Sequence, residues 1–140
     1  MASEERRVLE TVCDELRTSR ELTRAQWERL RSALGDRFDK AWELVEQRRM
    51  KKYVFEPSQR VAWIAVGRGS EYQILPASGY CDCSDFYFRV VDGEAGLCYH
   101  LLGQRLAEAL DAYEEVREND EFYDGLMEEW RNLSSAQPED

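Results

Sequence analysis

The sequence has little proline, little glycine and almost no histidine, with 3 Pro, 8 Gly and 1 His among 140 residues. This composition excludes collagen-like and low-complexity chains. Hydrophobic residues make up 43% of the sequence, which excludes a strongly disordered chain. Long hydrophobic runs are missing too, because the longest, Val61–Val66, is far too short to cross a bilayer. The first residues lack the apolar core of a signal peptide. We therefore expect an intracellular protein without membrane contact.

Basic residues are scarce in the second half of the chain. Residues 70–140 carry 4 Lys or Arg against 17 Asp or Glu, and the whole chain has a net charge of −10. Such a surface repels a phosphate backbone, which excludes a general nucleic-acid clamp. The densest basic run, in the first half, offers four candidate nucleic-acid contacts: Arg48, Arg49, Lys51 and Lys52. The alternative is that these cations sit in solvent at the C-terminus of a helix, where the helix dipole favours them.

Apolar residues recur every three to four positions in residues 1–50, and this period predicts helices. Thr23 followed by Gln26 has the pattern of a capping box, so a second helix should begin there and stop at Gly35. A third helix should end near Arg49. The N-terminal region is thus expected to be helical.

Residues 51–140 are expected to hold the rest of a single compact α+β unit. Alternating and continuous apolar runs up to Leu75, joined by short connections, predict a small antiparallel sheet. An apolar stripe from Leu102 to Tyr113 predicts a long helix, and a short C-terminal helix should follow from about Phe122.

Three of the four cysteines and the only histidine form two short pairs, Cys81-x-Cys83 and Cys98-x-His100. Zinc prefers four tetrahedral thiolate and imidazole ligands, and two such pairs joined by a loop can supply them. In an extended segment Cys81 and Cys83 project to the same side, whereas Cys98 and His100 would need to lie at the start of the following helix. The alternative is that these residues are only packed in the core, which is how we interpret Cys13.

Four protein ligands leave no open position for water or substrate, so the predicted Zn²⁺ is structural rather than catalytic. No other catalytic arrangement stands out in the sequence. A Ser/His or Cys/His pair would need the histidine that the metal already uses. The turn 67–70 lacks the lysine of a phosphate-binding loop and precedes a strand instead of a helix. We do not expect an enzyme.

The pattern CxC, a loop and then CxH with a following helix resembles the SWIM zinc-finger family. Residues 85–88 and 100–103 also look like that family's aromatic and helical positions. Between Leu30 and Leu133, the layout of helices, sheet, finger and trailing helix is similar to the free-standing SWIM subunit of the Shu complex and to archaeal SWIM proteins. The resemblance implies that Cys81, Cys83, Cys98 and His100 bind the metal.

The same resemblance implies a function. Free-standing SWIM subunits pair with a RecA-like recombinase paralogue and promote recombinase filament assembly in homologous recombination and DNA repair, so any DNA contact would come through that complex. The protein would then lie in the nucleus of a eukaryote or the cytoplasm of an archaeon. The rival interpretation is a direct nucleic-acid-binding SWIM module or regulator. Four apolar residues near the C-terminus are candidate partner contacts or a cover for the domain's own core: Phe122, Leu126, Met127 and Trp130.

Overall fold

A computed structural model describes residues 2–67, 71–76, 80–81 and 98–136. Its first third is helical, as predicted, with α1 (Ala2–Ser19), α2 (Arg24–Leu34) and α3 (Asp36–Glu46). The capping box at α2 is confirmed: the Gln26 amide donates to Thr23 Oγ1 at 3.2 Å, and the Thr23 amide donates to Gln26 Oε1 at 2.9 Å. Gly35 separates α2 from α3 with φ of 67°, a conformation in which a β-carbon is unfavourable.

The sheet has five strands in the order β4-β3-β2-β1-β5, which are β1 (Met50–Glu56), β2 (Arg60–Val66), β3 (Glu71–Leu75), β4 (Tyr80–Cys81) and β5 (Glu114–Asn119). The first three form the expected antiparallel meander, and the two-residue strand β4, which was not predicted, extends it. The prediction of an antiparallel sheet is confirmed for these strands and wrong for β5, which pairs in parallel with β1. The sheet is therefore mixed.

The two C-terminal helices differ in length from the prediction. α4 (Tyr99–Leu110) has 12 residues and α5 (Tyr123–Ala136) has 14, so the expected long and short helices are reversed. α4 ends early because Asp111 adopts the left-handed conformation, with φ of 58°, and the chain turns into β5. A short 3₁₀ turn, η2 (Asp120–Phe122), then leads into α5.

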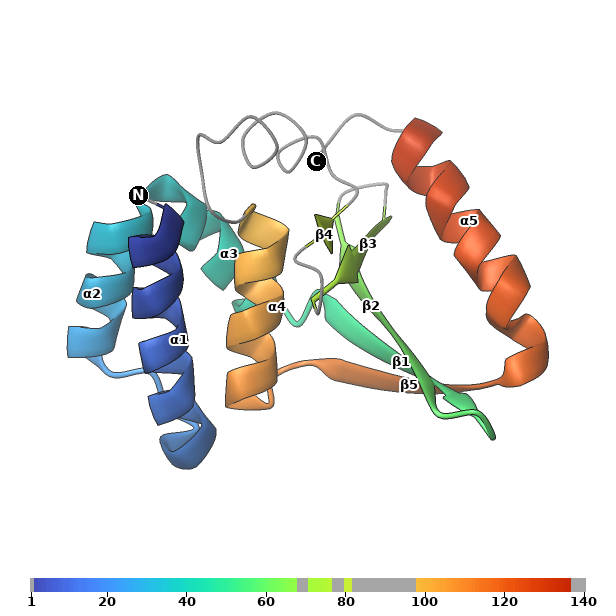
Figure 1. The fold of residues 1–140 in the computed structure, drawn as a ribbon, viewed down its shortest axis with the longest axis horizontal. Coiled ribbons are helices and arrows are strands. Elements are labelled where there is room, and N and C mark those ends of the chain that lie inside the picture. Colours follow the sequence, from blue (N-terminus) through green and yellow to red (C-terminus); the bar gives the residue numbers. More distant parts are fainter. Residues whose placement is uncertain (1, 68–70, 77–79, 82–97, 137–140) are drawn as a thin grey trace.

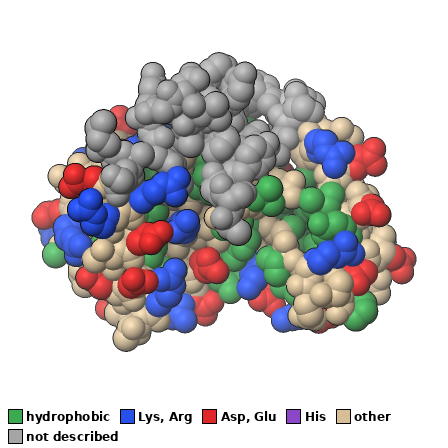
Figure 2. Space-filling model, in the orientation of Figure 1, with side chains coloured by type: hydrophobic (Ala, Val, Ile, Leu, Met, Phe, Trp, Pro, Cys, Tyr) green, Lys and Arg blue, Asp and Glu red, His purple; other side chains and the backbone are tan. Residues whose placement is uncertain are grey.

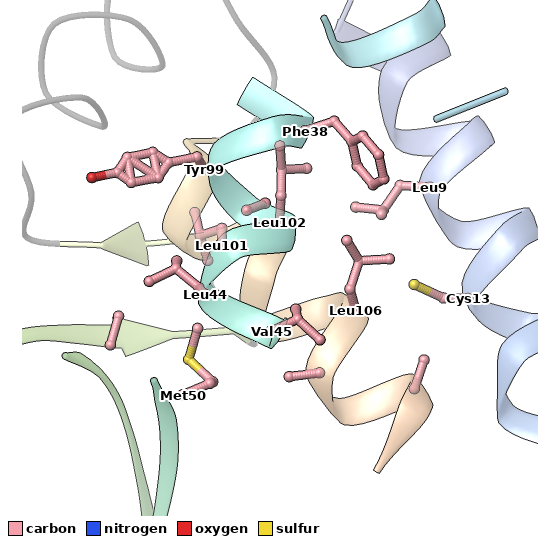
Figure 3. Close-up of a cluster of buried hydrophobic side chains, with 14 of the residues drawn as sticks. Leu9, Cys13, Phe38, Leu44, Val45, Met50, Tyr99, Leu101, Leu102 and Leu106 are labelled. Atoms are coloured by element: carbon pink, nitrogen blue, oxygen red, sulfur yellow. The ribbon is translucent and has the colours of Figure 1, made fainter. Parts of the chain in front are cut away.

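The elements form three layers, with α1–α4 on one side of the sheet and α5 alone on the other (Figure 1). The larger hydrophobic core lies between the sheet and α1–α4. Figure 3 shows part of it, with Leu9 and Cys13 from α1 facing Leu102 and Leu106 from α4. A smaller core under α5 contains the buried side chains of Phe55, Ala62, Ile64 and Trp130. None of the helices in the described ranges is long and apolar enough to span a membrane.

Candidate metal centre and its surroundings

The first turn of α4 carries two of the four predicted metal ligands. Cys98 is the N-cap of α4, with extended backbone angles (φ −77°, ψ 166°), and His100 is the second residue of the helix. This is the placement that the sequence required for the pair to face one ion. Both side chains are fully buried. The N-terminal end of α4 thus carries a buried cysteine and a buried histidine.

The imidazole of His100 lies between two aromatic rings. Its centroid is 4.7 Å from the ring of Tyr72 on β3 and 4.1 Å from the ring of Tyr99. Neither ring nitrogen has a hydrogen-bond partner within the described part of the chain. Burying a polar atom without a partner destabilises the folded protein by about 1–3 kcal/mol. Each ring nitrogen of His100 is therefore expected to have a hydrogen-bond or metal partner. A metal ion bound to one of the two nitrogens would provide one of these partners.

The strand that carries Cys81 lies beside the same end of the core. Cys81 pairs with Ile74 in the register between β3 and β4, and β4 also contacts α4. Residues opposite each other in an antiparallel pair share a face, so the Cys81 position is on the face of Ile74 and Tyr72, which α4 covers. Cys83 lies outside the described residues. Among the described residues alone, no group of three metal-ligating side chains comes together.

The donor set fits zinc, which binds thiolate sulfur and imidazole nitrogen in closed tetrahedral sites. The unpartnered nitrogens of His100 are the structural observation that supports this fit. One buried residue nearby was missed in the sequence analysis. Gln104, one turn after His100 on α4, is fully buried, and its Oε1 has no partner among the described residues. The sequence did contain a signal for its burial, because Gln104 interrupts the apolar stripe of this helix.

Cys13 is separate from this site, as the sequence predicted. It lies on α1 in the larger core, and its thiol is 3.7 Å from the carbonyl oxygen of Arg105. Burial raises the pKa of the Cys13 thiol from 9.0 to about 11. This cysteine is a packing residue.

The four basic candidates do not gather in one patch. Arg48 is exposed, while the guanidinium of Arg49 donates to the carbonyl oxygen of Val66 at 2.7 Å. Lys51 and Lys52 are consecutive strand residues, so they point to opposite faces of the sheet. Lys51 Nζ is 3.7 Å from Glu114 Oε1, and Lys52 Nζ lies 5.7 Å from the ring centroid of Trp63. Three of the four cations therefore have contacts within the chain.

The C-terminal stripe divides between core and surface. Trp130 is buried against the sheet, and its indole nitrogen donates to Glu71 Oε1 at 2.9 Å. Leu126 and Met127 are partly buried and pack against the same core. Only Phe122, in η2, is exposed, with 51% of its surface accessible. Three of the four residues thus cover the domain's own sheet, which was the alternative to partner binding.

Comparison with known proteins gives one informative relative. No family model matches the chain, and no solved structure matches it. A curated protein from Dictyostelium discoideum, named zinc finger SWIM domain-containing protein 7 homolog, is 31% identical over 98 residues. The alignment covers 69% of this chain, which spans 63% of the relative's own length. The chain is thus similar to a SWIM zinc-finger protein, in agreement with the spacing of its cysteines and histidine.

Proposed function

We propose that this protein is a non-catalytic adaptor whose fold is completed by one structural zinc ion. Cys81, Cys83, Cys98 and His100 would hold the metal. The observation that carries the proposal is the burial of His100 at the start of a helix, two residues after a buried cysteine. Neither of its ring nitrogens has a partner among the residues that the structure describes. Neutral imidazole and thiolate are the forms that bind zinc.

The role of the site follows from the elements that carry its ligands. A bound zinc ion supplies a cross-link between protein ligands and no reactive position, because all four of its sites are occupied by side chains. In this chain the cross-link would join β4, at the end of the meander, to the start of α4. α4 packs along α3 and contacts the sheet, so its position determines how the two halves of the domain meet.

We further propose that the partner is a RecA-like recombinase paralogue and that the complex supports homologous recombination. Two features support this. The chain is related to a SWIM domain-containing protein, and its strongly acidic second half favours a basic protein partner over nucleic acid. A direct nucleic-acid interface has less support, because the basic residues 51 and 52 lie on opposite faces of the sheet.

Metal analysis tests the site. The purified chain should contain one zinc ion per molecule, and Cys98→Ala or His100→Ala should lose it and lower the midpoint of urea unfolding. Cys13→Ala is the matched control, since it removes a buried cysteine outside the predicted set and should keep the zinc. A folded protein without stoichiometric metal, or full zinc retention by Cys98→Ala, would contradict the proposal.

Partner binding is tested separately, by co-expression with the RecA-like paralogues of the source genome. We expect one of them to form a stable heteromer with the wild-type chain, while Cys98→Ala should fail to bind it. If no paralogue binds the zinc-loaded chain, the metal site stands and the proposed partner is wrong.

A further inference from the structure

One edge of the sheet carries the acidic strand β5. Its inner side pairs in parallel with β1, and it is the last strand in the sheet order. Within the described ranges, no strand pairs with its outer side. An open strand edge exposes backbone N–H and C=O groups that can pair with an added strand.

The two faces of β5 differ in charge. Glu115 and Arg117 lie on the face toward α4, where Arg117 forms ion pairs of 2.8 Å with both Glu56 and Glu115. Glu114, Val116 and Glu118 lie on the opposite face, the one on which α5 packs farther along the sheet, together with Tyr53 and Phe55 of β1. Among the described residues, the ion pair that these three side chains make on that face is the one of 3.7 Å between Glu114 and Lys51. The unbalanced negative charge of the strand is therefore on the α5 face.

On the same face of the sheet, aromatic and apolar side chains lie next to β5, toward the middle of the sheet. Tyr53 is the register partner of Val116, and its ring centroid lies 4.9 Å from that of Trp130. Figure 2 shows hydrophobic side chains gathered at the surface between α5 and the sheet. Burial first, and then the carboxylates of Glu71, Glu118, Glu114 and Glu129, raise the pKa of Tyr53. The surface next to β5 thus consists of aromatic and apolar side chains with carboxylates around them.

This surface already holds one cation from the chain itself. The guanidinium carbon of Arg60 lies 3.7 Å from the ring centroid of Tyr123, which packs on Phe55 in the same core. A cation over an aromatic face is favourable by about 0.5–1 kcal/mol at exposed sites.

We propose that the outer edge of β5 is a docking site for an extended basic segment of a partner protein. The segment adds a sixth strand to the sheet, and its lysine or arginine side chains, two residues apart, lie on the α5 face against Glu114 and Glu118. Backbone pairing provides the affinity and the carboxylates select the charge. The inference rests on the proposed adaptor function for its partner, but its test does not depend on the metal site.

The probe is a synthetic peptide, acetyl-Lys-Thr-Lys-Thr-Lys-Thr-Lys-amide, titrated into the full chain with its metal and followed by amide NMR shifts. Shifts should concentrate on residues 114–119. Glu118→Lys should weaken binding by about tenfold, because it removes an attraction and adds a repulsion. Glu118→Gln should give a smaller loss of about threefold. Glu115→Gln is the matched control, three residues before Glu118 and on the other face of the strand, and should change affinity by less than twofold.

A peptide N-methylated at alternate residues tests strand addition, because it keeps the charge but cannot complete the ladder of hydrogen bonds. Two such peptides are compared, one methylated at the odd residues and one at the even residues. The peptide whose methylated amides face β5 should lose binding, whereas the other should keep it, because its free amides still face the strand. Equal binding by both N-methylated peptides, shifts outside β5, or equal effects of Glu118→Lys and Glu115→Gln would overturn the proposal. Zinc content measured on the same samples separates this outcome from failure of the metal site.

Discussion

Single residues show how burial decides the chemistry of a side chain in this protein. Cys13 and Cys98 are both fully or almost fully buried, yet only Cys98 lies at the start of a helix beside a buried histidine. Cys13 instead packs between α1 and α4, and burial raises the pKa of its thiol to about 11. The thiolate is the reactive form of cysteine, so this shift makes Cys13 inert near neutral pH.

We predict that iodoacetamide modifies Cys13 at pH 8 roughly a hundredfold more slowly in the native protein than in urea. With a pKa of about 11, only about one thiol in a thousand is ionised at pH 8, against about one in ten for a thiol with the unperturbed pKa of 9.0. Mass spectrometry of the tryptic peptide 8–17 measures this residue alone. Equal rates in native and unfolded protein would show that the thiol is accessible.

The predicted ligands illustrate what residue patterns can and cannot give. Spacing alone placed Cys98 and His100 at a helix start, because a pair two residues apart can face one ion only in extended or irregular backbone, and the structure has them there. The same spacing says nothing about neighbours that are distant in sequence. The contact of His100 with Tyr72, and the burial of Gln104, depend on how α4 packs against β3.

At the scale of elements, the packing of α3 against α4 depends on a glycine. A β-carbon at Gly103 would lie 3.2 Å from Leu44 Cδ1 and 3.3 Å from the backbone oxygen of Ala41. The leucine methyl group can move, whereas the carbonyl oxygen is fixed in α3. Gly125 in α5 offers a matched comparison, because a β-carbon there has no neighbour within 4 Å among the described residues.

We predict that the two Gly→Ala variants change stability in opposite directions. Gly125→Ala should raise the free energy of unfolding by about 1 kcal/mol, which is the gain in helix propensity. Gly103→Ala should lower it by about 1 kcal/mol, because the cost of overpacking exceeds the same gain. Urea unfolding followed by circular dichroism measures both variants. A stabilising Gly103→Ala would show that α3 and α4 separate at little cost.

The sheet shows where element prediction from sequence fails. Strands β1–β3 were recognisable because their apolar and β-branched residues are buried on at least one face. β5 has the sequence EEVREN, in which Val116 is the only apolar residue and glutamate is unfavourable for strands. Its strand conformation comes from pairing with β1, a partner far away in sequence. Edge strands often carry such charges, since charge discourages pairing with other chains of the same kind.

For the whole molecule, the main feature is that the two hydrophobic cores differ in size. α1–α4 and one face of the sheet enclose most of the buried apolar side chains, while the core under α5 has Trp130 as its only large helical anchor among the described residues. α5 contacts mainly β3 and η2. The sequence did not predict this three-layer arrangement. The apolar residues along α5 are equally consistent with a helix that covers its own sheet and with one that binds a partner protein.

We predict that native-state hydrogen exchange separates α5 from the rest of the domain. Amides of α5 should open with a free energy at least about 2 kcal/mol below those of α4, and with a smaller dependence on urea, because opening α5 exposes only the smaller core. α1 is the control, since it is also near a terminus but packs in the larger core through Leu9, Val12 and Leu16. Its central amides should match α4. Equal opening free energies in α4 and α5 would mean that the two cores unfold together, so the sheet would transmit stability between its faces despite their difference in size.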